Sequence, residues 1–385
     1  MKSKSKAKKH ILMVSRPICL PWDEASKNFT WELAKRIKDF KFHLLTYKKL
    51  PEKFSNLVGH SIYTSPSLRL GFLQKTKLVK FLFSIPKEID LLHFLFTPSK
   101  LSSSIIKAIL KRDRLRGFNR KTVQTIATLD FEKINKDNVE AYLFGKKIIT
   151  HSDFSRKFLE GLGLKNVQRI YPGIDLEKFK PASKDKVLMK KLGFSEKEKI
   201  ILYSGEYARL KAIDDILKAF SQLAKEHRDF KLVLACRIKS RADINKRNEI
   251  VKNLKKQNLS NKVVFLGTFS EMPKLYNLAD VFLFTPREMK GKFDIALVVL
   301  EAMACSVPVI LSNTAALKEV VKIKNSAIVL EKNNVKYLKQ NILKVLTQKK
   351  LADQIKQKAR ENCQKHFDIK QSAQNYKKVY QALTK

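Results

Sequence analysis

One carboxylate stands out in the sequence because its surroundings are almost wholly apolar. Glu301 lies in residues 295–305, where nearly every other side chain is apolar. Such a stretch predicts a helix buried against a sheet, and a carboxylate is rarely buried without a partner. The first backbone N–H groups of this helix, near residues 294–297, lack partners within the helix and attract phosphate. The stretch therefore predicts half of an anion-binding site. The alternative is a buried helix whose Glu301 is capped by a neighbouring side chain.

The same stretch carries a motif that resembles a known signature. Glu301 is followed by Ala-Met-Ala and, two residues later, by Val-Pro-Val at 307–309. This motif resembles the donor-site signature of the retaining glycosyltransferases of family 4, which have the GT-B fold. The resemblance covers residues 145–320, and it extends to the rest of the chain only by architecture. It implies that Glu301 binds the ribose hydroxyls of a nucleotide sugar.

The resemblance also assigns residues on either side of Glu301. The family's first Glu is replaced by Phe293, and the nearest carboxylate, Asp294, is expected to take its place at the sugar. Ile295 and Ala296, at the helix N-terminus, are expected to bind the donor. Ser306 stands where the family usually has Gly.

A second loop is expected to supply positive charge to the donor. It begins at Gly205 and resembles the family's Gly-Arg-x-x-x-x-Lys-Gly, in which Arg and Lys clamp the diphosphate. Lys211 falls at the Lys position, whereas Glu206 replaces the Arg, and Arg209 is expected to compensate. These cations would meet the negative charge that the diphosphate gains as the glycosidic bond breaks. The alternative is that both are solvated basic side chains of a Lys-rich protein.

The remaining assignments lie outside these two loops. Arg237 stands with Cys236 where the family has Gly-x-Gly, and it is expected at the donor. In the N-terminal half, Lys27 and Asn28 correspond to the family's glycine-rich first loop, on the side expected to bind the acceptor. The His that the family often has after its middle strand corresponds to Ala127.

These residues need strands and helices to position them. Apolar runs bounded by turn residues alternate with segments of helical period, which predicts parallel, doubly wound sheets. Helices are predicted to begin near Phe29 and to cover residues 153–161, and residues 335–359 are predicted to be helical. The predicted strands are residues 11–15, 41–47, 61–63, 89–94, 122–129, 147–151, 168–171, 199–204, 230–235, 263–266, 281–284 and 309–311.

The length of 385 residues predicts two domains. We expect an α/β chain of two Rossmann-like domains with a cleft between them, as in the GT-B fold. Residues 1–178 would form the N-terminal acceptor domain, and residues 179–365 the C-terminal donor domain. Residues 366–385 would form a helix that returns to the N-terminal domain, as the resemblance implies.

Composition limits the classes of partner. The balance of 79 Lys and Arg against 36 Asp and Glu gives a net charge of +43, which favours anionic partners. A nucleic-acid-binding protein would explain the charge, but the sequence has no recognised reader module, so nucleic acid is an unlikely partner. The four widely spaced cysteines are expected to be free thiols. The seven His residues form no metal-spaced pair, and no metal or cofactor is expected beyond the nucleotide sugar itself.

The basic surface also bears on location. Residues 67–85 form a basic amphipathic segment with Lys75, Lys77 and Lys80, and the first ten residues are basic. The segment is expected to be an ordinary domain helix or a surface that meets anionic membrane. The apolar run at 11–14 is too short for a signal peptide, and no run would span a membrane. The protein is therefore expected in the cytoplasm, where it could lie at the membrane face.

The resemblance implies that the protein is a glycosyltransferase. It would move a sugar from a nucleotide-sugar donor to a saccharide or lipid-linked acceptor, with retention and without a bound metal. The alternative is a non-catalytic GT-B-like protein that binds a sugar nucleotide or acts as a scaffold.

Overall fold

The computed structural model describes residues 7–66, 70–289, 292–314 and 316–385. Most of the basic tail, Leu68 and Arg69 of the amphipathic segment, and Gly291 of the loop before Glu301 lie outside this range. The chain divides into two compact units, each built around one sheet. Unit 1 comprises Met1–Gly173, Gly291–Asp294 and Ile369–Lys385, and unit 2 comprises Ile174–Lys290 and Ile295–Asp368.

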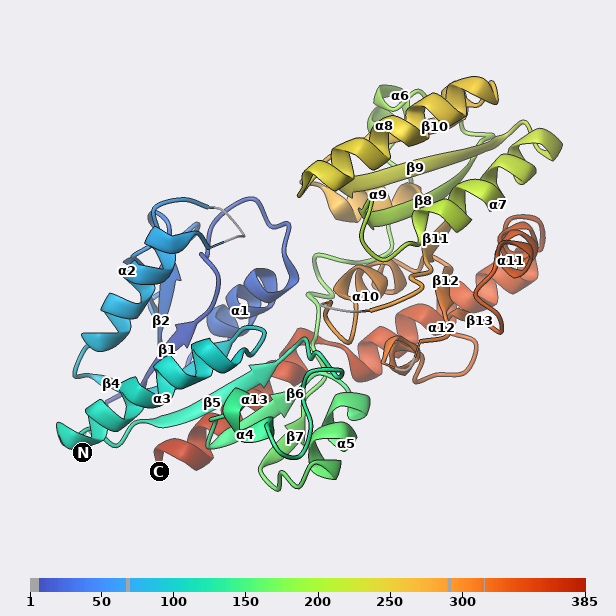
Figure 1. Ribbon diagram of the computed structural model, residues 1–385. Helices are drawn as coiled ribbons and strands as arrows, with labels where there is room; N and C mark the ends of the chain where they lie inside the picture. The colour runs from blue at the N-terminus through green and yellow to red at the C-terminus, as the bar shows by residue number, and fades with distance from the viewer. Residues whose placement is uncertain (1–6, 67–69, 290–291, 315) are drawn as a thin grey trace, which may run out of the picture. The chain divides into compact units, whose positions relative to one another are not determined.

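Unit 1 contains a seven-stranded sheet in which every neighbouring pair of strands is parallel (Figure 1). Its order is β3-β2-β1-β4-β5-β6-β7. The central strands are buried along almost their whole length, because helices cover both faces of the sheet. The strands are β1 His10–Val14, β2 Lys41–Thr46, β3 Leu57–Ser61, β4 Ile89–Leu95, β5 Lys121–Ile126, β6 Lys147–Thr150 and β7 Val167–Arg169.

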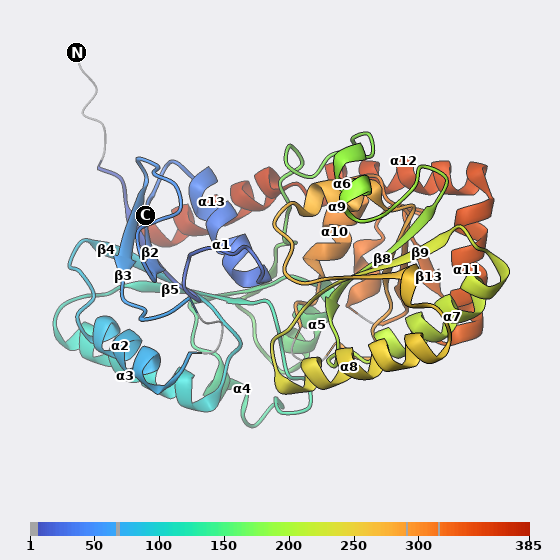
Figure 2. The ribbon, with the colours of Figure 1, turned by 90° about the horizontal axis from the view of Figure 1, so that it is seen from above.

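Helices α1 and α13 pack against one face of this sheet, and α2 and α3 pack against the other (Figure 2). The helices of unit 1 are α1 Ala25–Arg36, α2 Phe72–Phe83, α3 Lys100–Leu115, α4 Val139–Tyr142, α5 Asp153–Gly161 and α13 Ile369–Thr384. Helix α13 buries Tyr376 and Tyr380 in the core of unit 1. The hydroxyl of Tyr380 lies 2.8 Å from Nδ1 of His93, and that of Tyr376 lies 3.0 Å from the hydroxyl of Thr125. Residues 369–385 therefore complete unit 1.

Unit 2 contains a six-stranded parallel sheet in the order β10-β9-β8-β11-β12-β13. Helices α7, α8 and α11 contribute to the core on one face, while α9 and α10 lie on the opposite side of the sheet (Figure 2). The strands are β8 Lys199–Glu206, β9 Phe230–Arg237, β10 Val263–Leu266, β11 Val281–Phe284, β12 Val309–Ser312 and β13 Ile328–Leu330. The helices are α6 Lys186–Lys191, α7 Ile213–Glu226, α8 Arg241–Lys256, α9 Met272–Leu278, α10 Leu297–Ala304, α11 Val335–Thr347 and α12 Lys349–His366, with short 3₁₀ turns at Ser260–Lys262 and Leu317–Val320.

The strand order of unit 2 reverses direction at β8, which lies between β9 and β11. In open parallel sheets, ligands bind outside the carboxyl ends of the strands at such a switch point. The loops that follow β8 and β11 are therefore the places to look for a site. They are also the loops in which the sequence places Arg209, Lys211 and Asp294.

The predicted α/β architecture is confirmed, and two local predictions are wrong. Residues 335–359 are helical as predicted, in two helices, α11 and α12, that separate at Gln348 and pack on different partners, α7 and α10. The strand predicted at 61–63 lies earlier, at Leu57–Ser61, where Gly59 and His60 hide the strand pattern. Helix α1 begins at Ala25 instead of near Phe29, because the Glu24 side chain caps it by accepting from the Lys27 N–H.

Candidate active site

The loops after β8 and β11 are joined to each other. The backbone N–H of Arg287 donates to the carbonyl of Leu210 at 3.0 Å. The Arg287 guanidinium binds both oxygens of Asp215, in the first turn of α7, at 2.7 and 2.9 Å. Nζ of Lys211 lies 3.5 Å from a carboxylate oxygen of Glu288. At the switch point of unit 2, hydrogen bonds and ion pairs therefore hold the two loops together.

The backbone of the first loop is strained at the predicted cation. Leu210 and Lys211 have φ angles of 77° and 52°, in the left-handed region that side chains with a Cβ disfavour. Two such residues in succession cost on the order of 1–2 kcal/mol each, and such strain clusters at functional sites. The Leu210 side chain is buried, which anchors the turn, while the Lys211 side chain remains 65% exposed. The strained backbone therefore lowers the stability of the fold, and it holds Lys211 at the carboxyl end of β8.

Three basic side chains lie close to one buried carboxylate beside this loop. Glu206, the last residue of β8, is only 3% exposed. Its oxygens lie 3.0 Å from Nη2 of Arg237, 3.7 Å from Nη1 of Arg209 and 3.9 Å from Nζ of Lys239. The structure thus brings Arg209 and Arg237 together and adds Lys239, which sequence reasoning missed. The family's Arg is replaced by an anion that holds two other arginines in place.

Asp243 fixes the backbone around the cation cluster. Its carboxylate accepts hydrogen bonds from the N–H groups of Ala208, Lys239 and Ser240 and from the Ser240 hydroxyl. Burial alone would raise its pKa, but these hydrogen bonds outweigh it, so that the pKa lies below the ordinary value. Asp243 is therefore ionised at neutral pH, and it ties the loop after β8 to the N-terminus of α8.

Glu301 lies in α10, half-buried, with one oxygen capped. The hydroxyl of Tyr276, from α9, donates to its Oε2 at 2.8 Å. Burial raises the pKa of Glu301, while this hydrogen bond and the charge of Lys178 act to lower it. Within the described part of unit 2, the other oxygen, Oε1, has no hydrogen-bond partner. The capped carboxylate of the alternative interpretation is present, and it still has an oxygen available for a ligand.

Hydroxyl groups at the ends of β11 and β12 form the part of the site that sequence reasoning missed. Thr285 directly follows β11, Ser312 ends β12, and Thr314 is two residues further on. Their side-chain oxygens are shielded from solvent and make no hydrogen bond among the described residues. Buried polar atoms are nearly always paired, so unpaired ones point to a ligand or an ordered water. Their position directly after predicted strands is the signal that could have identified them.

The N-terminus of α10 lies slightly later than predicted. The helix spans Leu297–Ala304, with Ala296 as a cap residue that supplies no side-chain hydrogen bond. Ile295 and Ala296 are both buried. At the other end, Ser306 has a φ of 56°, and its N–H and that of Val307 bond to carbonyls of the last turn, those of Met303 and Ala302. This left-handed cap explains why glycine suits the position.

Asp294 lies in the loop after β11, but it belongs to unit 1 and not to unit 2. It is buried, and its Oδ2 accepts from the hydroxyls of Ser152 and Ser155, at the N-terminus of α5. Its N–H donates to the carbonyl of Ala127 at 3.1 Å. The structure therefore gives Asp294 partners that sequence reasoning did not anticipate, and its predicted role at the sugar stays a prediction.

Lys27 and Asn28 were predicted to lie in a loop, and this is wrong. Both lie in the first turns of α1, because the helix begins at Ala25. Lys27 is 1% exposed, and its Nζ donates to the carbonyl of Pro21 and to Asp23. The Asn28 amide donates to the carbonyl of Trp22, and its buried Oδ1 has no partner among the described residues. The hydrogen bonds of the Lys27 ammonium group thus hold the loop before α1 in place.

Comparisons with known proteins agree with this architecture. Among solved structures, a sucrose-phosphate synthase from Thermosynechococcus elongatus matches with a TM-score of 0.78 at 18% identity, over 98% of this chain and 99% of that chain. HepE of Anabaena, solved in complex with UDP and glucose, matches with a TM-score of 0.76 at 16% identity, over 97% of this chain and 100% of that chain. These likenesses define the fold as two Rossmann-like units of the GT-B class.

Sequence comparison adds a family match. Residues 184–362 match the model of the glycosyl transferases group 1 family. The N-acetyl-alpha-D-glucosaminyl L-malate synthase of Bacillus anthracis is 26% identical over 217 residues, which are 56% of this chain and 54% of that protein. An uncharacterized glycosyltransferase of Methanocaldococcus jannaschii is 25% identical over 365 residues, 91% of this chain and 93% of that protein. The enzyme class is glycosyltransferase.

Proposed function

We propose that the protein transfers a sugar from a nucleoside diphosphate sugar to a saccharide or lipid-linked acceptor, with retention and by a metal-independent reaction. The donor binds to unit 2 at the carboxyl ends of β8, β11 and β12. Lys211 and Arg209 neutralise the diphosphate, Glu301 accepts from the ribose hydroxyls, and Thr285 and Ser312 complete the polar lining. No cofactor takes part, and the nucleotide sugar is a substrate.

The observation that carries this proposal is the switch point of unit 2. Two loops joined by the Arg287–Leu210 hydrogen bond hold a strained, exposed Lys211 beside the cations gathered by Glu206. A leaving diphosphate gains negative charge as the glycosidic bond breaks, so cations fixed before the reaction stabilise the transition state more than the ground state. The UDP and glucose in the HepE complex support a nucleotide sugar as the ligand.

The direct test of the proposal is transfer of labelled sugar. The full chain would be incubated with labelled UDP-glucose and a panel of other nucleotide sugars, with saccharide and lipid-linked acceptors, and with and without a chelator. We expect transfer from one donor to one acceptor class, undiminished by the chelator and with the anomeric configuration kept.

Thermal shift with the same donor panel separates the two functional hypotheses. A donor at about 100 times its dissociation constant adds about 2.7 kcal/mol to the unfolding free energy, which is readily seen. Stabilisation by a donor without any transfer would favour the non-catalytic alternative. Neither stabilisation nor transfer with any donor would contradict both.

Helix α2 favours a second element of the proposal, peripheral association with anionic membrane from the cytoplasmic side. Only Gln74 and Leu82 of this helix are buried, while Phe72 and Leu73 are 83% and 71% exposed. Lys75, Lys77 and Lys80 are exposed beside them. No helix among the described residues is long and apolar enough to cross a bilayer. Apolar side chains that can insert, flanked by lysines, suit an interfacial helix.

Vesicle co-sedimentation tests the membrane element. The protein should pellet with anionic vesicles at low salt, pellet less at high salt, and stay in solution with neutral vesicles. Replacing Lys75, Lys77 and Lys80 by Glu should abolish binding. Replacing the exposed Lys344, Lys349 and Lys350 of unit 2 by Glu is the matched control and should change it little. Equal loss in both triple variants would mean that total charge, and not α2, drives binding.

A further inference from the structure

Three histidines form a row across neighbouring strands of unit 1. His10 begins β1, His43 lies in β2, and His60 lies in β3. Nε2 of His43 is 3.0 Å from Nδ1 of His10, and Nδ1 of His43 is 2.8 Å from Nε2 of His60. The sequence separations of 33 and 17 residues hid this arrangement from sequence analysis, which found no metal-spaced pair. The parallel pairing of β1, β2 and β3 brings the three rings together.

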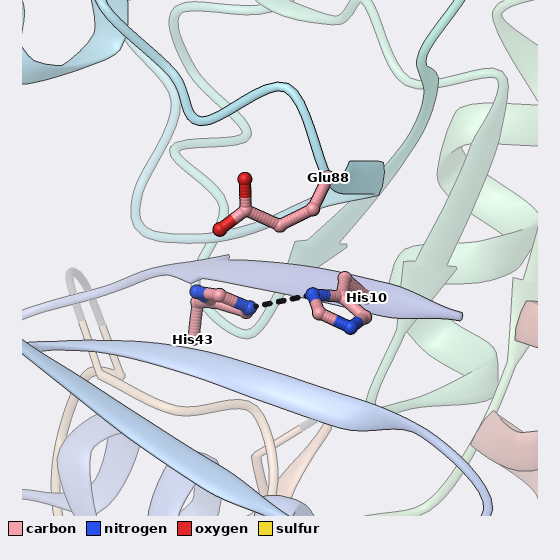
Figure 3. Close-up of side chains that lie close together, drawn as sticks. All are labelled: His10, His43 and Glu88. Carbon is pink, nitrogen blue, oxygen red and sulfur yellow. Dashed lines mark hydrogen bonds between the residues drawn. The ribbon is translucent and has the colours of Figure 1, made fainter. Parts of the chain in front are cut away.

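A carboxylate completes the group. Glu88 lies in the turn immediately before β4, and its side chain extends over the His43 ring in Figure 3. One ligand atom each from His10, His43 and Glu88 lie within 4.8 Å of one another. Two nitrogens bound to one tetrahedral zinc ion at about 2.0–2.1 Å stand roughly 3.3 Å apart, close to the separation of the His10 and His43 nitrogens. The exposed Glu88 side chain can move toward such an ion without disturbing the core.

His60 has the place of a second-shell partner and not of a ligand. A histidine that binds a metal with one ring nitrogen usually donates the N–H of the other to a fixed acceptor, which sets its tautomer. If Nδ1–H of His43 donates to Nε2 of His60, the lone pair of Nε2 faces His10 and Glu88. The His60 ring is itself held against Phe81 of α2, with a centroid distance of 5.2 Å.

We propose that His10, His43 and Glu88 bind a divalent transition-metal ion of the zinc class, with water as the fourth ligand and His60 fixing the His43 ring. Two imidazoles and one carboxylate suit zinc and leave one position open. Lys41 is paired with His10 across β1 and β2, and the positive charge of its side chain would repel the ion. Asp90 is occupied by the His10 N–H and by Lys9.

The ion would cross-link strands in the sheet of unit 1. It would join β1 and β2 to the turn before β4, the strand on the other side of β1. Because the ligands come from separate strands, the complete site exists only in the folded unit, and binding therefore stabilises it. The site belongs to unit 1, whereas the proposed donor site belongs to unit 2, so failure of one proposal leaves the other standing.

The test uses the full chain without an affinity tag, stripped with a chelator. Cobalt(II) is added first, because four-coordinate Co²⁺ with nitrogen ligands gives visible absorption bands that Zn²⁺ then abolishes by displacement. We expect one ion per chain, bands of a four-coordinate site, and a higher Tm with Zn²⁺ but not with Mg²⁺, which prefers six oxygen ligands.

Variants at the rim of the site keep the test independent of folding. His10→Gln and Glu88→Gln change partly or fully exposed side chains, and each should weaken Zn²⁺ binding at least tenfold. His60→Phe should weaken it about 10–100-fold through the second shell. His227→Gln, in unit 2, is the control and should bind as the unchanged chain does. Absence of stoichiometric binding, or equal binding by the doubly substituted His10→Gln, Glu88→Gln chain, would overturn the proposal and leave an adventitious ion only.

Discussion

The carboxyl ends of the two sheets carry similar side chains that are used in opposite ways. In unit 1, buried Lys27 donates to Pro21 and Asp23, and buried Asp294 accepts from two serines. In unit 2, Lys211 is held exposed by a strained backbone, and the Thr285 hydroxyl is buried without a partner in the described chain. The comparison teaches that charge alone does not identify a site. Buried polar atoms without a partner occur in both units, so among the described residues it is the left-handed backbone at Leu210 and Lys211 that distinguishes the edge of unit 2.

Acid should produce the largest effect, and it should fall on unit 1. Burial lowers the pKa of His93 and of His151 to about 3, so neither takes up a proton in the folded state near pH 5. The unfolded chain does so below about pH 6.5. Stability is therefore complete above that pH and is lost as the pH falls, by about 2 kcal/mol per histidine between pH 7 and 5.

Tryptophan fluorescence measures this loss in unit 1 alone, because both tryptophans, Trp22 and Trp31, lie there. Denaturant titrations at pH 7 and pH 5 should show a lower unfolding midpoint in acid. His93→Gln, which does not titrate, should make the difference smaller. A midpoint that does not change between pH 7 and 5 would contradict the assignment of these histidines as neutral core groups.

Lys211→Ala should lower kcat by about 100- to 1,000-fold, because it removes a fixed cation from charge that develops in the transition state. Arg209→Ala should act in the same direction if Arg209 replaces the family's missing Arg. Steady-state rates of sugar transfer measure both. The matched change in unit 1, Lys27→Met, should instead lower the unfolding free energy by about 2 kcal/mol and leave donor binding intact. If Lys211→Ala lowered only the stability and Lys27→Met lowered only the activity, the proposed difference between the two sheet edges would be contradicted.

Glu301→Ala should weaken binding of the nucleotide sugar by about 1.5–3 kcal/mol, since two ribose hydroxyls lose a charged acceptor. Calorimetry on the folded variant measures this loss. Tyr276→Phe removes the cap on Oε2 while keeping the carboxylate, so it should disturb donor binding less than Glu301→Ala does. If a folded Glu301→Ala variant binds the donor as the unchanged chain does, Glu301 is only a capped structural residue.

Ser306→Gly should have the smallest effect, a gain of up to about 1 kcal/mol in stability. The φ of 56° costs a residue with a Cβ more than it costs glycine, although glycine also gains entropy in the unfolded chain. Chemical denaturation measures the gain. Ser306→Ala keeps the Cβ and serves as the control, and an equal gain from both variants would show that the backbone angle is not the cause.

The sequence predicted most elements of the fold because their signals are local. The strands Val263–Leu266 and Val281–Phe284 and the helix Asp153–Gly161 lie where the sequence predicted them. The sequence pattern could not show that Asp294 accepts hydrogen bonds from Ser152 and Ser155. It also could not show that Arg209 and Arg237 lie beside Glu206. Those contacts join residues far apart in the chain or depend on which strands are neighbours. The motif at Glu301 indicated the resemblance to glycosyltransferases, but only the fold reveals the hydroxyls of Thr285 and Ser312 that have no partner among the described residues.

The position of α13 also determines when unit 1 can finish folding during synthesis. His93 and Thr125 emerge from the ribosome long before Tyr380 and Tyr376, which form their hydrogen bonds. All of unit 2 is translated in between, which takes on the order of 10–40 s at about 5–20 residues per second. The nascent first sheet must therefore wait with one face only partly covered while the later unit folds. Unit 2 is thus expected to reach its native state before the half of the protein that was made first.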